Sequence, residues 1–353
     1  MNLARRRKAW LWASGVLGTG LLITGVLTPL PFIELSPGPT FNTIGDVAGK
    51  PLIDISGTPT FPTDGHLDMT TVNERGGPDN GVFVGRLMIG WADSHTRILP
   101  REVFYPDDVS ASEVAAQNSR DFSDSTSDSV VAALTYLKRP VETVVIVSSV
   151  ITGEPADGHL EPGDQILAID GHAITTADGV GVAMKPVKPG DVVVVKVRRG
   201  ESDVHEEKVT TTTNPKDPTR AFMGISVGET ARAPFHLVIQ LDGVGGPSAG
   251  MMLSLGIIDK LTPGQLNGGR FVAGTGTITP EGVVGPIGGI EQKMLGARRA
   301  GATFFLAPGD NCADVLDGGI PDGLTVAKVS TLSDAVTAVE NYVAGRPVTA
   351  CTR

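Results

Sequence analysis

A serine and a lysine in the last third of the chain could together carry out nucleophilic catalysis. Ser248 lies in the small-residue segment Gly245-Gly246-Pro247-Ser248-Ala249-Gly250. Apolar residues recur at helical spacing directly after this segment, so we expect Ser248 at a helix N-terminus, where unpaired backbone N–H groups stabilise a developing oxyanion. The alternative is an ordinary N-cap serine in a Gly-Pro turn, which the segment taken alone favours.

Lys293 lies on the apolar stripe of a second expected helix. Gly288-Gly289 precede this helix, Gly301 ends it, and its apolar face is formed by Ile290, Met294 and Ala297. A lysine on such a stripe either extends past the stripe to solvent or is desolvated, and desolvation lowers the pKa of its amine towards neutrality. A neutral amine can accept the proton of a serine hydroxyl, so we interpret Ser248 and Lys293 as a nucleophile and its general base.

These segments resemble the proteolytic domain of the Lon protease family. GPSAG surrounds the serine, a TGTIT turn follows, and VVGPIGGIEQKML surrounds the lysine. Within the family, the chain is most similar to the ATP-independent, membrane-anchored Lon-like proteases that carry a PDZ domain, and the resemblance covers nearly the whole chain. It implies that Ser248 is the nucleophile, Lys293 the general base, and Thr275 the hydrogen-bond partner that orients the lysine.

One position departs from the family pattern. Lon proteases with an ATPase usually have an aspartate three residues before the serine, whereas this chain has Gly245. A role assigned to that carboxylate therefore does not transfer. Gly245 and Gly246 are instead expected to support the site, since small residues leave room for a substrate backbone.

Composition and the missing motifs exclude other classes. The chain has 353 residues, 41% of them apolar, and a net charge of −10, which argues against nucleic acid as a partner. There is no GxxxxGK[ST] phosphate loop, so no nucleotide and no other cofactor is expected. None of the histidines has a metal-binding spacing, so no metal is expected: His66, His95, His159, His172, His205 and His236. His236 precedes the serine and could act as a base, but it begins an alternating strand, which favours a structural role.

Residues 1–30 are interpreted as a cytoplasmic tip and a transmembrane helix. Arg5-Arg6-Arg7-Lys8 precede an uncharged run from Ala9 to Pro31 that is long enough to cross a bilayer. A cleaved signal peptide is the alternative. In either case the basic cluster stays inside, so everything after residue 31 is expected outside the cytoplasm, on a single-pass protein of the cell membrane.

Residues 31–139 are expected to form a β-rich and helical region, and its first part, from Pro31 to about Gly90, is interpreted as a spacer between the membrane helix and the catalytic domain. Short alternating strands separated by Pro, Gly and Asp occupy its first half. Ser110 to Glu113 could begin one helix and Ser125 to Ser129 another, and the acidic, serine-rich stretch from Ser119 to Ser129 is expected to be a solvated loop or a helix start.

Residues 140–213 look like a PDZ domain of the α+β class. The string LEPGDQILAIDG combines a Pro-Gly-Asp turn, a buried run and an Asp-Gly turn. Such domains bind an extended peptide at a sheet edge beside a helix. The loop that holds a terminal carboxylate should precede Val144, but no Gly-hydrophobic-Gly pattern is found there, and Gly179 and Gly181 fall in the expected groove helix. Binding of internal segments is therefore as compatible with the sequence as binding of C-termini.

Residues 214–353 are expected to form the Lon-type protease domain, also α+β, after the linker Asn214 to Pro218. Cys312 and Cys351 are the only cysteines. Because both are placed outside the cytoplasm, where oxidation is favoured, we expect a disulfide between them. Two unrelated thiols are the alternative.

The sequence therefore favours a membrane-tethered, ATP-independent serine endopeptidase with a Ser/Lys dyad that cleaves extracytoplasmic proteins, recruited or gated through the PDZ groove. The rival interpretation is a PDZ-type binding or chaperone protein with a latent protease fold. Whether Ser248 can be acylated separates the two. The family resemblance also allows a homo-oligomer.

Overall fold

The chain forms two compact units in the computed structural model, which describes residues 3–78, 80–93, 95–105, 109–200, 203–241 and 243–352, with side chains from Trp10 onward. The first unit contains Met1–Ile53, Thr60–Ala133 and Ile239–Arg353, and the second contains Asp54–Pro59 and Leu134–Val238. These units differ from the predicted ranges 31–139, 140–213 and 214–353, because strands distant in sequence share a sheet in each unit.

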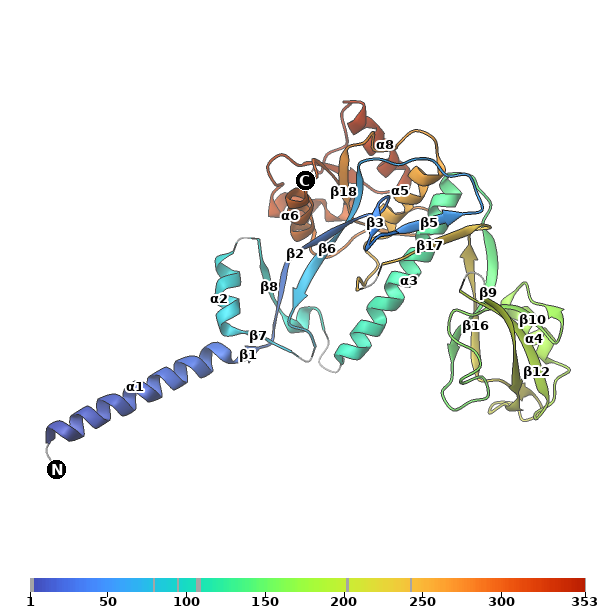
Figure 1. Cartoon of the computed structure of the whole chain (residues 1–353), viewed down its shortest axis with the longest axis horizontal. Coiled ribbons are helices and arrows are strands. Elements are labelled where there is room, and N and C mark those ends of the chain that lie inside the picture. Colours follow the sequence, from blue (N-terminus) through green and yellow to red (C-terminus); the bar gives the residue numbers. More distant parts are fainter. Residues whose placement is uncertain are drawn as a thin grey trace. The chain divides into compact units, whose positions relative to one another are not determined.

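The first unit is built on a six-stranded mixed sheet (Figure 1). Its strand order is β22 (Thr325–Val329), β21 (Phe304–Pro308), β18 (Phe271–Gly274), β6 (His66–Arg75), β2 (Phe32–Asn42) and β8 (Arg97–Pro100). The pairs from β22 to β6 are parallel, whereas β2 is antiparallel to both β6 and β8. Short two-stranded pairs accompany it: β1 (Pro29–Leu30) with β7 (Val82–Phe83), β3 (Asp46–Val47) with β4 (Lys50–Pro51), and β19 (Thr277–Ile278) with β20 (Val284–Gly285).

The interpretation of Pro31 to about Gly90 as a spacer is wrong. Strands β2 and β6 come from this stretch, and β6 lies between β2 and β18 in the centre of the sheet. Alternating short strands predict a sheet but not which strands pair, and β18, which pairs with β6, lies about 200 residues further along the chain. The parallel strands are joined through helices, so this unit is mixed α/β rather than a segregated α+β arrangement.

Helices cover both faces of this sheet. Ala273 packs with buried residues of α6 (Ile290–Ala300), while a Cβ at its neighbour Gly274 would lie 2.7 Å from Met252 Sδ on α5 (Gly250–Leu261). Successive residues of a strand face opposite sides, so α5 and α6 lie on opposite faces. The remaining helices of the C-terminal part are α7 (Cys312–Gly318) and α8 (Leu332–Val343).

Residues Ala111–Tyr136 form one continuous helix, α3, rather than two helices with a solvated loop between them. No glycine or proline interrupts the stretch, and its serines find partners within the fold. Ser125 Oγ donates to the carbonyl of Pro247 (2.9 Å), and Ser254 Oγ on α5 donates to the carbonyl of Ser129 (3.0 Å). The serines that suggested a loop therefore bind the segment that carries Ser248.

The N-terminal part contains α1 (Leu3–Leu27) and α2 (Val84–Ala92). Within α1, the residues Trp10–Leu27 are long and apolar enough to cross a membrane. The side chains of Arg5 to Lys8, on which the predicted orientation depends, lie outside the described residues. A one-turn helix, η1 (Arg101–Val103), follows β8.

The second unit is a sheet of order β13 (Asp203–Thr210), β12 (Val192–Arg199), β10 (Gln165–Ile169), β9 (Glu142–Val150) and β16 (Ile225–Arg232), with β11 (His172–Ala173) added to β10. The helix α4 (Ala177–Met184) contacts β16. The short pair of β14 (Thr212–Thr213) with β15 (Ala221–Phe222) belongs to it as well, and β5 (Ile53–Ser56) pairs with β17 (His236–Ile239). Strand β16 lies beyond residue 213, so the sheet extends past the predicted boundary.

The predicted place of the carboxylate-binding loop, before Val144, does not precede an edge strand of this unit. Both edges of β9 are paired, with β10 and with β16, so the strand that begins near Val144 cannot accept a peptide. Among the described strands, β16 pairs only with β9 and is the edge strand beside α4. The segment before it, Met223-Gly224, follows β15 and has Gly224 at φ +82°, so this turn, and not the residues before Val144, precedes the edge strand.

Candidate active site

Ser248 lies two residues before α5, on a segment that is held in place by the end of β18. The N–H of Gly276 donates to the carbonyl of Ser248 (2.9 Å), and the N–H of Met251 donates to the carbonyl of Gly276 (3.1 Å). The N-cap of α5 is Ala249, which makes no side-chain capping bond. Ser248 is therefore not the N-cap, and its hydroxyl is available for other contacts.

Lys293 is buried on α6, with only 3% of its surface exposed. Gly289 precedes the helix in the left-handed region (φ 69°), and the N–H of Lys293 donates to its carbonyl. Lys293 Nζ donates to Ser248 Oγ at 2.7 Å and to Thr275 Oγ1 at 3.0 Å. These hydroxyls are its polar partners within the described chain, and no carboxylate lies within ion-pair distance there.

Burial lowers the pKa of Lys293 from its ordinary value of 10.5 to about 7. The cause is desolvation, which penalises the ammonium form because the surrounding side chains cannot replace its hydration. A carboxylate beside the amine would have the opposite effect. Near neutral pH a large fraction of Lys293 is therefore the free amine, the form that can remove a proton.

Thr275 connects the lysine to the serine backbone. It is fully buried just after β18, accepts from Lys293 Nζ, and donates from Oγ1 to the carbonyl of Ser248 (3.0 Å). Its one hydroxyl hydrogen is used on the serine carbonyl, so its lone pairs are left for the amine. The structure thus brings together Ser248, Lys293 and Thr275, the three residues singled out in the sequence.

Helix α3 holds the loop before Ser248, a contact that sequence reasoning missed. The N–H of Gly246 (φ +83°) donates to the carbonyl of Asn118 (2.9 Å), and a Cβ at Gly245 would lie 2.8 Å from Asn118 Cβ. Both glycines are thus required by close packing or by backbone conformation. Asn118 and Ser125 are seven residues apart on α3, so they lie on the same face of the helix, and this spacing is the only sequence signal that both contact the Ser248 loop.

The start of α5 presents two backbone donors beside Ser248 Oγ. The N–H groups of Ser248 and Ala249 have no acceptor within the described part of the chain. They precede a buried helix whose dipole places partial positive charge at this end. The arrangement suits a negative oxygen that forms beside Ser248.

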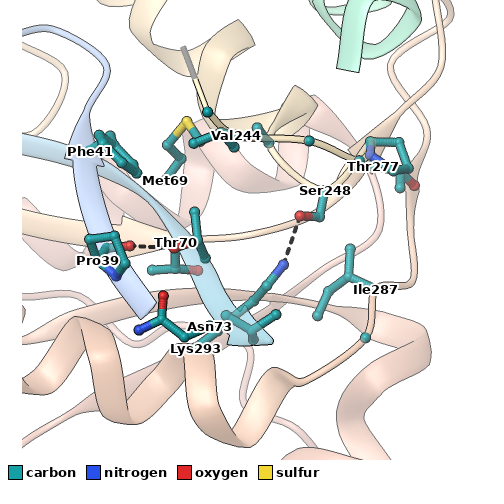
Figure 2. Close-up of a pocket in the computed structure, with 18 of the residues that line it drawn as sticks. Pro39, Phe41, Met69, Thr70, Asn73, Val244, Ser248, Thr277, Ile287 and Lys293 are labelled. Carbon is teal, nitrogen blue, oxygen red and sulfur yellow. Dashed lines mark hydrogen bonds between the residues drawn. The ribbon is translucent and has the colours of Figure 1, made fainter. Parts of the chain in front are cut away.

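A cleft of about 670 Å³ opens beside Ser248 and Lys293 (Figure 2). Three walls form it: residues 243–249, residues 286–288, and the strands β2 and β6. Apolar side chains dominate its lining, namely Pro39, Phe41, Met69, Val72, Val244 and Ile287. Lys293 is the only charged residue among those that line it in the described chain.

One wall of the cleft is a strand with a free edge. Strand β18 ends at Gly274, opposite Met69, so residues 70–75 of β6 have a described strand partner only on the side of β2. Thr70 to Asn73 from this stretch line the cleft. An extended chain could therefore hydrogen-bond along this edge next to Ser248.

The other predicted residues lie apart from this cleft. His236 is on β17 in the second unit, and its Nε2 lies 3.6 Å from Asp54 Oδ2. Cys312 and Cys351 are joined by a disulfide with Cα atoms 5.1 Å apart, and Cys351 packs against the apolar cluster beneath α6. This bond attaches the C-terminal tail to the first residue of α7.

Comparison with known proteins gives a family for this arrangement. Residues 158–340, about half of the chain, match the family described as the Lon protease (S16) C-terminal proteolytic domain. The chain is 31% identical over 187 residues to Lon protease 1 of Bacillus subtilis, a match that covers 51% of this chain and 23% of that protein. It is 32% identical over 180 residues to the Lon protease of Azospirillum brasilense, covering 50% and 20%. The chain thus spans about a quarter or less of these relatives.

Solved structures that are similar include PDZ domains. The PDZ domain of the SdrC-like protein from Listeria monocytogenes is 27% identical, with a TM-score of 0.22, and the match covers 24% of this chain and 86% of that one. The corresponding domain from Listeria innocua is 28% identical, with a TM-score of 0.22 and coverage of 26% and 99%.

Proposed function

The chain belongs to the Lon protease (S16) family, and we propose that it is a serine endopeptidase in which Ser248 is the nucleophile and Lys293 the general base. The observation that carries this proposal is the 2.7 Å contact between Lys293 Nζ and Ser248 Oγ in a buried site where the pKa of the amine is about 7. A structural lysine would not be expected to face a serine hydroxyl without a carboxylate partner.

The proposed reaction follows from the contacts of the neutral amine. The lone pair of Nζ accepts the hydroxyl proton of Ser248 along the 2.7 Å contact, while an amine N–H donates to Thr275 Oγ1. Ser248 Oγ then attacks the peptide carbonyl, and the free N–H groups at the start of α5 bind the oxyanion. The lysine gives its proton to the leaving amine. Water, activated in the same way, hydrolyses the acyl-enzyme.

The cleft supports an extended polypeptide as the substrate class. The free edge of β6 can pair with a main chain in any sequence, whereas a folded protein rarely presents a free strand. The apolar lining, and the absence of an anionic side chain among the described residues that form it, favour apolar substrate side chains next to the scissile bond.

Acylation of Ser248 is the decisive test. The full chain, Ser248→Ala, Lys293→Met and the control Ser254→Ala are each incubated with a fluorophosphonate probe and with unfolded casein. We expect labelling and cleavage only for wild type and Ser254→Ala, since Ser254 contacts α3 and not the cleft. Absence of labelling in the folded wild type would favour the rival function, a PDZ-type binding protein with a latent protease fold.

We infer that cleavage does not use ATP. The printed sequence contains no GxxxxGK[ST] segment, and the aspartate usual in Lon proteases with an ATPase is replaced by Gly245. Initial rates on unfolded casein with and without ATP and Mg²⁺ should agree. A rate that requires ATP would refute this inference.

We also propose that α1 anchors the chain with the protease outside the cytoplasm. Its apolar stretch Trp10–Leu27 has 18 residues, about 27 Å as a helix, close to the thickness of a hydrocarbon core. Alkaline phosphatase fused at the C-terminus should be active, and a cytoplasm-only reporter at the same place should be silent. The reverse result would place the protease inside.

The second unit is proposed to be a PDZ-type module that recruits or gates peptides between β16 and α4. The free edge of β16 supports this, and the Glu229 carboxylate on β16 accepts from the N–H of Ala177 at the start of α4 (2.7 Å), which fixes the helix beside the strand. Ile225→Pro should weaken peptide binding measured by anisotropy, whereas Val144→Pro should disrupt the sheet itself. Peptides with free and amidated C-termini distinguish terminal from internal recognition.

A further inference from the structure

Helix α2 has an outward face that is apolar where a soluble protein would place polar residues. Its exposed positions are Met88, Ile89, Trp91 and Ala92, and Phe83 directly before it is also exposed. The exposed fractions of the large side chains are 52% for Phe83, 63% for Met88, 60% for Ile89 and 70% for Trp91. We call these four residues the α2 patch. A helix that faces water normally has the opposite pattern.

The charge on α2 is turned away from this patch. Arg86 is the only charged residue of the helix, and its guanidinium binds both oxygens of the fully buried Glu34 carboxylate on β2. The inner face is completed by Leu87 and Gly90, with Gly90 close to Ile98 of β8. The half-buried Arg86 is thus directed at a buried carboxylate, and none of the helix's charge lies among the residues of the α2 patch.

Hydrogen bonds fix α2 at the end of the helix proposed to span the membrane. The N–H of Val84 donates to the carbonyl of Thr28 (3.2 Å), and Phe83 pairs with Pro29 in the β1–β7 ladder. A Cβ at Gly85 would lie 2.8 Å from Val26 Cγ1, so the two helices are in close contact there. Figure 1 shows α2 beside β7 and β8, near the C-terminal end of α1.

The depth of α2 follows from these contacts. If Trp10–Leu27 fills the hydrocarbon core, residues 26–29 lie at its boundary with the headgroups. The start of α2 is bound to those residues and therefore lies at the same level. Tryptophan is enriched at this level of a bilayer, and short helices with an apolar face bury that face in it.

We propose that the α2 patch is a membrane-contact surface that inserts into the outer leaflet beside α1. This inference rests on the proposed function of α1 as a membrane anchor. The occupant is lipid acyl chain and not a folded partner, because the patch is tied to the point where the chain leaves the bilayer. Together with α1, it would give the first unit a second attachment to the membrane and so restrict its rotation about α1.

The three tryptophans of the chain allow a direct test, because Trp10 and Trp12 lie on α1 and Trp91 on α2. The full chain is reconstituted in phosphatidylcholine vesicles with bromine near the headgroup end or near the methyl end of the acyl chains. The variant Trp10→Phe/Trp12→Phe reports on α2, and Trp91→Phe reports on α1. A control has all three replaced by Phe and carries Ile320→Trp, an exposed position on the loop after α7.

We expect Trp91 emission to shift to shorter wavelength in vesicles and to lose more intensity with bromine near the headgroup end than near the methyl end. The control at position 320 should lose none. Quenching of Trp10 and Trp12 without quenching of Trp91 overturns the α2 proposal and leaves the anchor intact. No quenching of any of the three overturns the anchor as well. A blue shift of Trp91 without quenching indicates cover by protein, such as a second copy of the chain, and also overturns the proposal.

Discussion

The pH dependence of peptide cleavage tests the assignment of Lys293 as base more sharply than loss of activity does. Only the neutral amine can accept the proton of Ser248, so acylation should follow the fraction of free amine. Burial holds the pKa of Lys293 at about 7, against 10.5 for an exposed lysine. The perturbation is therefore a change of pH across this pKa.

The two values give different curves. With a pKa of about 7, the neutral fraction rises about tenfold from pH 6 to pH 8 and then levels off. With an ordinary lysine pKa, the fraction would rise roughly a hundredfold over the same interval and would continue to rise at higher pH. A histidine base would also give a plateau, so the pH profile must be measured for a Lys293 variant as well as for the wild type.

The assay is the initial rate of cleavage of a fluorogenic peptide well below KM, since kcat/KM reports the pKa of the free enzyme. Lys293→Met should be inactive at every pH, and Ser254→Ala should keep the wild-type midpoint. A rate that rises without levelling off up to pH 9 would refute the desolvated-amine argument. A preserved midpoint near pH 7 in a still-active Lys293→Met would transfer the role to another group.

Three further outcomes are expected. Between pH 7 and 10.5, Lys293 is protonated more in the unfolded chain than in the folded chain, so the free energy of unfolding rises with pH in this window. In urea titrations, Lys293→Met should therefore raise the free energy of unfolding by up to about 5 kcal/mol below pH 7, and by less as the pH approaches 10.5. Gly245→Asp should destabilise the loop, because its Cβ would clash with Asn118. In Gly245→Asp/Asn118→Gly, which removes this clash, the new carboxylate should raise the midpoint of the pH profile by stabilising the Lys293 ammonium, and an unchanged midpoint would show that position 245 does not act on Lys293. Reduction of the bond between Cys312 and Cys351, whose positions are 39 apart, should lower stability by about 3–4 kcal/mol, and two freely alkylated cysteines in the unreduced protein would contradict the disulfide.

The core of the candidate site could be predicted because its signals are local. Helical spacing placed Lys293 among Ile290, Met294 and Ala297, and the structure buries all four. Thr275 needed the family resemblance, since nothing in its neighbours shows that its hydroxyl accepts from the lysine. Neighbouring residues in the sequence were therefore sufficient to predict that Lys293 is buried, but not to predict its hydrogen-bond partners.

What could not be predicted depends on contacts between distant segments. Asn118 binds Gly246 across more than 120 residues, and β6 pairs with β18 across about 200. A serine-rich stretch predicts a loop by propensity, yet tertiary contacts at Ser125 and Ser129 keep α3 helical. Strand alternation identifies a buried face, but the partner of a strand and the location of its free edge are set by the whole sheet.

The same limit explains the error in the second unit and shows why the error matters for function. A peptide can join only an unpaired edge, so a motif that identifies the domain does not identify its binding strand. The string LEPGDQILAIDG contains β10, an interior strand, whereas the edge strand beside α4 among the described strands is β16, which follows the motif by more than 50 residues. The same holds for the cleft beside Ser248, because the edge of β6 at residues 70–75 is accessible only where β18 has ended, at Gly274. In both units the proposed peptide site is where a neighbouring strand is missing, and only the complete sheet order reveals that place.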